Sequence, residues 1–189
     1  SLTVVQCILL MFAGMDFYDA INHALTTMST GGFSTKQASI AHFDTPIIQY
    51  IIIVFMFIAG TNFTLLYFGV KLKFKKFWEN DEFKWYLGAV GALTFVIVGA
   101  LYLHNLHDES FEENFRAVLF QVVSVITTTG YATTDFTTWG SFVTFLFFLL
   151  LFTGASAGST SGGMKLVRII LLMKNGFLEF KRRLHPNAI

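Results

Sequence analysis

Three long stretches of this sequence carry almost no charge, and they constrain its fold more than any other feature. They cover residues 47–70, 85–103 and 141–173. A helix needs about 20 mostly apolar residues to cross a membrane, and the first two stretches reach that length without interruption. The chain is 54% hydrophobic and 13% charged, whereas a soluble domain has about 25% charged residues. The sequence therefore predicts an all-α integral membrane protein.

Composition excludes several other classes of protein. The net charge of +1 lacks the basic excess of a nucleic-acid-binding protein, so we expect no nucleic acid partner. The single cysteine, Cys7, cannot build a disulfide framework or a cysteine metal cluster. The apolar segment Leu2–Ala13 is only about half a span. We therefore expect it to be the end of a membrane helix, and the chain to be part of a longer protein.

The distribution of charge predicts the orientation in the membrane. Lys and Arg favour cytoplasmic loops, and they gather in residues 71–84 and 174–189. Residues 14–44 and 104–140 hold an excess of Asp and Glu, so we expect these segments to face outward. The acidic outer face is interpreted either as solvated loop or as a vestibule that attracts cations.

The two outward segments contain an internal repeat. Phe17–Met28 and Phe115–Ile126 are each about three helical turns long, and each is followed by a run of Thr, Ser and Gly. An offset of 98 residues superposes the two copies without a gap and aligns Gly32 with Gly130. A repeat of this length indicates duplicated structural units, which are common in membrane transport proteins.

We expect one unit in residues 1–76 and a second in residues 77–189. The first has a truncated outer helix, a half-helix at 17–28, a loop at 29–35 and an inner helix at 45–73. The second has an outer helix at 84–104, a half-helix at 115–126, a loop at 127–133 and a broken inner helix at 141–180.

The small loop residues after each half-helix favour cation chemistry. Non-helical backbone at membrane depth is tolerated where it is buried in protein or lines a wet cavity. Backbone carbonyls in such loops can replace the water shell of a cation, and the C-terminal ends of the half-helices add partial negative charge. Together these features favour a monovalent cation over an anion.

Residues 26–35, 125–135 and 154–168 resemble the Trk/Ktr/HKT potassium transporters, and residues 184–188 are most similar to the TrkH branch. The resemblance implies four pore-loop units around one pore, of which this chain holds most of the second and all of the third. It implies a backbone-carbonyl filter for potassium with one key glycine in each unit. The implied filter residues are Ser29, Thr30, Gly31, Gly32, Phe33, Thr127, Thr128, Thr129, Gly130 and Tyr131.

The same resemblance implies an intramembrane gate loop below the filter, within residues 154–163. The implied gate residues are Gly154, Ser156, Gly158, Ser159, Thr160, Gly162, Gly163, Lys165 and Arg168. Four glycines predict that this segment is not a continuous helix, although small residues also suit close helix packing. For the aligned segment Ala59–Asn62 we expect a packed helix with at most a kink. Lys165 and Arg168 suit either snorkelling to the cytoplasmic interface or repelling cations and holding the gate loop.

The resemblance further implies a multi-pass protein of the bacterial cytoplasmic membrane with its filter loops facing outward. Implied partners are membrane lipid, the remaining pore-loop units of the same chain, a second copy in a homodimer, and a cytoplasmic nucleotide-binding regulatory subunit of the TrkA type. Potassium is the transported ion, and no organic cofactor is expected.

Two other functions compete with potassium uptake. A non-conducting membrane scaffold or assembly subunit with degenerate pore loops would explain a chain with only two units. A serine hydrolase is suggested by Gly154–Gly158, which matches the G-x-S-x-G motif around Ser156. That fold needs a large α/β domain with a well-placed His and acid, and after Ser156 only Glu179 and His185 are available. We therefore expect no enzyme.

Overall fold

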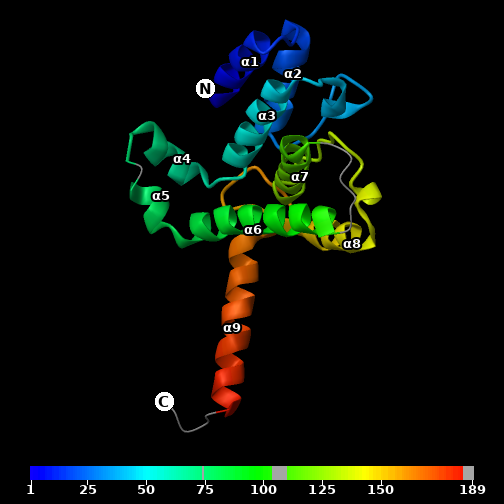
Figure 1. The fold of residues 1–189 in the computed structure, drawn as a ribbon. Helices are drawn as coiled ribbons and strands as arrows, with labels where there is room; N and C mark the ends of the chain where they lie inside the picture. Colours follow the sequence, from blue (N-terminus) through cyan, green and yellow to red (C-terminus); the bar gives the residue numbers. More distant parts are fainter. Residues whose placement is uncertain (74, 104–109, 185–189) are drawn as a thin grey trace.

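The computed structural model describes residues 1–73, 75–103 and 110–184, and the regular secondary structure in this part of the chain is helical apart from two short strands (Figure 1). This agrees with the predicted all-α class. The elements in chain order are α1 (Leu2–Phe12), α2 (Phe17–Met28), η1 (Ser39–His42), α3 (Pro46–Ala59), α4 (Phe63–Val70), α5 (Lys75–Glu79), α6 (Asp81–Leu103), α7 (Phe111–Ile126), η2 (Phe136–Trp139), α8 (Ser141–Leu150), β1 (Thr153–Gly154), β2 (Met164–Lys165) and α9 (Leu166–Leu184).

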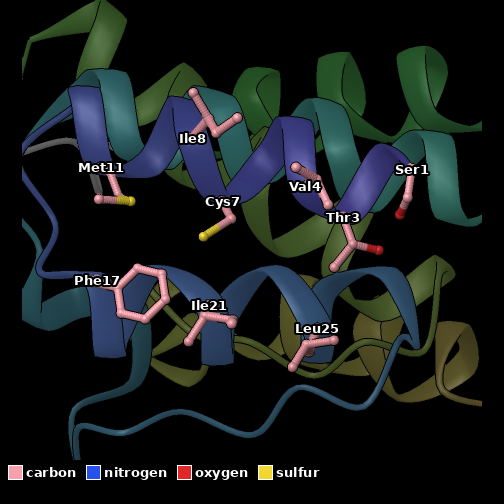
Figure 2. Close-up of a pocket in the computed structure, with 9 residues that line it drawn as sticks. All are labelled: Ser1, Thr3, Val4, Cys7, Ile8, Met11, Phe17, Ile21 and Leu25. Carbon is pink, nitrogen blue, oxygen red and sulfur yellow. The ribbon is translucent and has the colours of Figure 1, made fainter.

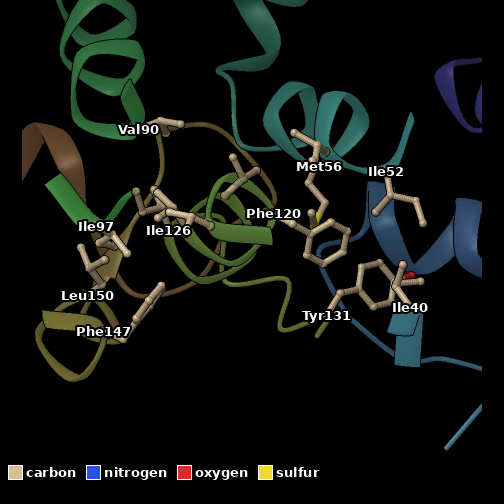
Figure 3. Packing of buried hydrophobic residues seen from close by; sticks show 14 of the residues in the cluster. Ile40, Ile52, Met56, Val90, Ile97, Phe120, Ile126, Tyr131, Phe147 and Leu150 are labelled. Carbon is tan, nitrogen blue, oxygen red and sulfur yellow. The ribbon is translucent and has the colours of Figure 1, made fainter. Parts of the chain in front are cut away.

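The buried hydrophobic residues gather around α7. This helix packs against α6, α3 and α8, so it lies between the N-terminal and C-terminal parts of the fold. Figure 3 shows Phe120 beside Met56 and Tyr131, while Ile126 lies on the side of Ile97. Contacts between apolar side chains thus fix the end of α7, from which one of the two predicted loops begins.

The helix α7 begins earlier than the predicted Phe115. Ser110 and Glu113 form a capping box, in which the Glu113 N–H donates to Ser110 Oγ over 3.4 Å and the Ser110 N–H donates to Glu113 Oε2 over 3.0 Å. These bonds satisfy backbone donors that the first helical turn leaves free. The capping box therefore adds a turn at the outer end of the predicted half-helix.

The predicted inner helix at 45–73 is wrong as a single helix, and so is the prediction of at most a kink at Ala59–Asn62. The axes of α3 and α4 differ by 113° across this break. Asn62 caps α4 by accepting from the Thr64 N–H over 2.8 Å, and the Phe63 N–H donates to the Gly158 carbonyl over 3.1 Å. The backbone here bonds to another segment instead of continuing its own helix.

The second predicted break, within residues 154–163, is confirmed. The helix α8 ends at Leu150 and α9 begins at Leu166, with no helix between them. The two-residue strands β1 and β2 pair in parallel and close the neck of the intervening loop. Beyond this loop α9 extends away from the other helices (Figure 1).

Helix length limits which segments can cross a membrane unbroken. Within the described residues, α6 is the single helix that is both long and apolar enough, and α3 with α4 adds a second span if the bent pair counts as one. An apolar groove of about 510 Å³ lies between the antiparallel helices α1 and α2, and Cys7, Phe17 and Leu25 are among its lining residues (Figure 2). This part of the surface has the character of one that faces lipid or another helix.

Candidate functional site

The two loops that follow α2 and α7 share hydrogen bonds at aligned positions. In the first loop (residues 29–35) the Thr26 hydroxyl donates to the Phe33 carbonyl over 2.9 Å. In the second loop (residues 127–133) the Ser124 hydroxyl donates to the Tyr131 carbonyl over 2.7 Å. These residues correspond at the offset of 98, so the sequence repeat is also a structural repeat.

Backbone conformation repeats as well. Thr30 and Thr128 have φ of 52° and 55°, and Gly32 and Gly130 have φ of 67° and 83°. The residues between and before them do not have positive φ, so the sign of φ alternates along each loop. The helix C-caps Ser29 and Thr127 lead into these loops at the negative ends of α2 and α7.

The two loops touch each other. A β-carbon placed on Gly32 would lie 1.8 Å from the Thr129 carbonyl oxygen, so the backbone of one loop occupies the side-chain space of the other. Tyr131 reaches across in the same direction, with its hydroxyl 2.5 Å from Thr26 Oγ1 and donating to the His23 carbonyl over 3.2 Å. The two loops are therefore in direct contact at Gly32.

The predicted filter residues differ in exposure. Thr30, Thr127, Thr129 and Tyr131 are buried, Gly32 and Thr128 are half-buried, and Ser29, Gly31, Phe33 and Gly130 are exposed. Aligned residues do not share an environment: Tyr131 is 1% exposed and Phe33 is 77% exposed. The difference arises because α2 covers Tyr131.

The small-residue segment (residues 154–163) lies against both loops. The Thr30 hydroxyl donates to the Thr160 carbonyl over 3.0 Å, and the Gly162 N–H donates to Thr128 Oγ1 over 2.6 Å. Thr30 and Thr128 are aligned by the repeat, so equivalent residues of the two loops hold the same segment. Within it Gly154 and Ser156 are buried, Ser159 is half-buried, and Gly158, Thr160, Gly162 and Gly163 are exposed.

The break between α3 and α4 also holds this segment. The Ser156 N–H donates to the Gly60 carbonyl over 3.1 Å, and the Thr160 hydroxyl donates to the Ala59 carbonyl over 3.2 Å. Gly60 permits this close approach, because an added β-carbon would lie 3.0 Å from Ala155 Cβ in the segment and 2.6 Å from Tyr86 Oη. The two breaks that the repeat aligns therefore pack directly against each other.

Lys165 and Arg168 differ in what they contact. The Lys165 ammonium donates to both the carbonyl and the hydroxyl of Ser161, so it holds the end of the small-residue segment. Arg168 is exposed, and within the described ranges no hydrogen bond or ion pair engages its guanidinium. The sequence leaves open whether these two residues snorkel to the interface or hold the predicted gate loop. A contact that holds the loop is present for Lys165 and not for Arg168 among the described residues.

Sequence reasoning missed two residues of this site, Asn62 and Glu82. The Asn62 side-chain amide donates to the Ala157 carbonyl over 2.7 Å, and the Ala157 N–H donates to Glu82 Oε1 over 2.5 Å. The repeat contains a signal for Asn62, because it aligns Ala59–Asn62 with part of the small-residue segment. Glu82 has no comparable signal, since it lies among other charged residues.

Acidic side chains in the segments that the sequence predicts to face outward are partly paired. Glu112 forms an ion pair with the buried Arg116 at 2.6 Å, and Asp19 forms one with Lys36 at 3.2 Å. Hydrogen bonds from the Thr137 hydroxyl and N–H hold the pKa of Asp135 below its usual value, so this carboxylate keeps its charge in mildly acidic solution. Asp108 and Glu109, also predicted for the acidic face, lie outside the described residues.

The hydrolase alternative finds no support in the geometry. Ser156 Oγ is buried and has no hydrogen-bond partner among the described residues. A nucleophilic serine needs a base within hydrogen-bond reach. His185, the one histidine after Ser156, lies outside the described ranges, as do the other tail residues 186–188.

Comparisons with known proteins agree with this geometry. The family described as "TrkH: Cation transport protein" matches residues 8–189. The chain is 41% identical to the Trk system potassium uptake protein TrkH of Escherichia coli, over 100% of this chain and 39% of that protein. It is 31% identical to the Trk system potassium uptake protein TrkG of the same organism, again over 39% of that protein.

A solved structure matches the whole fold. The crystal structure of the potassium transporter TrkH from Vibrio parahaemolyticus superposes with a TM-score of 0.94 at 38% identity, covering 100% of this chain and 41% of that one. The chain thus spans about two fifths of the length of the relatives that it matches.

Proposed function

This chain belongs to the TrkH family of cation transport proteins, and from that premise we propose that it forms part of a potassium uptake pathway across the cytoplasmic membrane. The proposal rests mainly on one observation. Two loops with matching hydrogen bonds and alternating φ meet at Gly32 and Thr129, each at the C-terminal end of a short helix. Alternating φ aligns successive peptide groups, and rings of aligned carbonyls can replace the water shell of a dehydrated cation.

In this proposal the filter consists of residues 29–33 and 127–131, with Gly32 and Gly130 at the key positions. The loops face outward, and the connector between α4 and α6 and the end of α9 face the cytoplasm, following the positive charge of these segments. Potassium is the cargo and passes along the loop carbonyls. The small-residue segment is the gate, since it crosses beneath both loops and is anchored to each.

Two further units of the same protein would complete the ring. Support comes from the two open sides of the loop pair: Gly130 has no atom within 4 Å of an added β-carbon, and Phe33 is exposed where its counterpart Tyr131 is covered. In each case the aligned position is covered where the two loops meet: Gly32, aligned with Gly130, lies against the Thr129 carbonyl, and Tyr131, aligned with Phe33, is buried. A homodimer and a TrkA-type regulatory subunit are further proposed partners, in keeping with the name "Trk system" of the relatives.

A scaffold subunit with degenerate loops is the second candidate, and the loop geometry favours it less. Degenerate loops have no reason to retain matching positive φ at Thr30 and Thr128, because this conformation costs roughly 1–2 kcal/mol in a residue other than glycine. The test is rubidium uptake by the complete transporter that contains this chain, purified into proteoliposomes. We expect uptake that external potassium competes away and sodium does not. Absence of uptake in correctly inserted protein would favour the scaffold.

A further inference from the structure

In the small-residue segment, the backbone N–H and carbonyl of Ala157 both form hydrogen bonds with side chains from outside the segment. The Ala157 N–H donates to Glu82 Oε1 over 2.5 Å, and the Ala157 carbonyl accepts from Asn62 Nδ2 over 2.7 Å. Asn62 is the N-cap of α4 and Glu82 lies in the first turn of α6. The connector that runs from Asn62 to Glu82 contains α4 and α5, and its two ends therefore converge on Ala157.

Charge makes the Glu82 contact to Ala157 stronger than the neutral Asn62 contact to the same residue. A hydrogen bond with an ionised acceptor is roughly twice as strong as a neutral one. At the other end of the segment the Lys165 ammonium binds the Ser161 carbonyl. The negative Glu82 carboxylate thus binds a backbone donor, the Ala157 N–H, and the positive Lys165 ammonium binds a backbone acceptor, the Ser161 carbonyl. Both charges therefore strengthen their hydrogen bonds to the segment.

The connector between Asn62 and Glu82, the two residues that bind Ala157, is largely exposed. None of the five residues of α5 is buried, and Glu79 pairs with Lys75 and Lys76 at the surface, at 3.9 Å and 3.2 Å. A movement of this connector would change the position of Glu82 relative to Asn62. Because both side chains bind Ala157, such a movement would reach the small-residue segment.

We propose that Glu82 is a positioning residue that holds the gate closed, and that movements of the connector from Asn62 to Glu82 transmit cytoplasmic events to the gate. The proposal rests on the function proposed above, in which the small-residue segment closes the pore. Glu82 contacts no permeating ion in this account. It acts through Ala157, while selectivity stays with the two loops.

The test compares Glu82→Ala and Glu82→Gln with the matched control Glu79→Gln in the complete transporter. Glutamine keeps an acceptor oxygen but loses the charge, so it should give an intermediate effect. The first measurement is hydrogen–deuterium exchange of peptides covering residues 154–163 in lipid nanodiscs. We expect exchange to speed up on the order of tenfold in Glu82→Ala, less in Glu82→Gln, and not at all in Glu79→Gln.

The second measurement is rubidium and sodium flux of the same variants in proteoliposomes. We expect rubidium leak to rise in the same order, with the rubidium-to-sodium ratio unchanged, a pattern that general misfolding would not produce. Unchanged exchange in Glu82→Ala would overturn the proposal, and so would faster exchange without more leak. A wild-type protein without selective flux would instead contradict the proposed function, and exchange alone would then decide whether Glu82 holds the segment.

Discussion

Gly32 lies where the two loops meet, and no other residue type fits there. An added β-carbon would lie 1.8 Å from a backbone oxygen, which cannot move aside as a flexible side chain can. Its φ of 67° is a second obstacle, because a β-carbon disfavours this region. The position therefore demands glycine for both steric and conformational reasons.

Gly32→Ala should abolish rubidium uptake by the complete transporter and lower its melting temperature. Gly14→Ala is the matched control, because Gly14 also has positive φ, at 104°, but has open space around it. That control should lose only the conformational term of about 1–2 kcal/mol and keep its uptake. Equal effects of the two substitutions, measured by thermal unfolding and tracer flux, would argue against close contact of the loops.

Tyr131 joins the second loop to the first half of the chain through its hydroxyl. Tyr131→Phe removes the bonds to Thr26 Oγ1 and the His23 carbonyl and should destabilise the protein by about 1 kcal/mol. We also expect weaker discrimination against sodium. Tyr67→Phe serves as the control, because Tyr67 is 56% exposed. A melting temperature and ion ratio like those of wild type in Tyr131→Phe would contradict this role.

At the scale of elements, the repeat predicts the loops better than the inner helices. Residue types and spacing suffice for α2, for both Thr/Gly loops and for the break within residues 154–163, because these depend on local backbone preferences. The bend at Gly60 was missed because one glycine among apolar residues usually leaves a helix intact. The bend depends on long-range bonds from Asn62 and Phe63 to the small-residue segment, and Glu82 joins the site only through the same tertiary packing.

The small-residue segment should behave as a barrier. Deleting residues 158–162 removes its bonds to Thr30, Thr128 and Ala59, so we expect rubidium flux through the complete transporter to rise. Size-exclusion profile and expression serve as controls for folding. Flux that stays at the wild-type level in a well-folded deletion variant would show that the segment does not gate the pore.

At the scale of the whole molecule, the two loops meet through one contact, and we propose that this contact recurs in a larger arrangement. The contact is asymmetric. Gly32 of the first loop lies against the Thr129 carbonyl of the second, whereas Gly130, the residue aligned with Gly32, has open space beside it. The relatives are also much longer, since the chain covers 39% of the TrkH protein of Escherichia coli. Both observations agree with a pore that needs further units.

The 189-residue chain alone should therefore not conduct. We expect it not to restore growth at low potassium in bacteria that lack their own uptake systems, whereas the complete transporter should. Western blotting of the membrane fraction checks that the short chain is inserted. Growth rescue by the chain alone would mean that two loops, or two copies of the chain, suffice for a pore.

Ion selectivity of Gly130→Ser in the complete transporter tests the central claim most directly. Gly130 has open space for a side chain, although its φ of 83° disfavours a β-carbon. The substitution adds a hydroxyl beside the proposed ion path and changes the field of the carbonyl ring. The measurement is the ratio of potassium to sodium permeation in proteoliposomes, with the variant matched to wild type for insertion. The account predicts that this ratio falls because sodium permeation rises. A ratio equal to that of wild type would contradict the assignment of these loops as the filter.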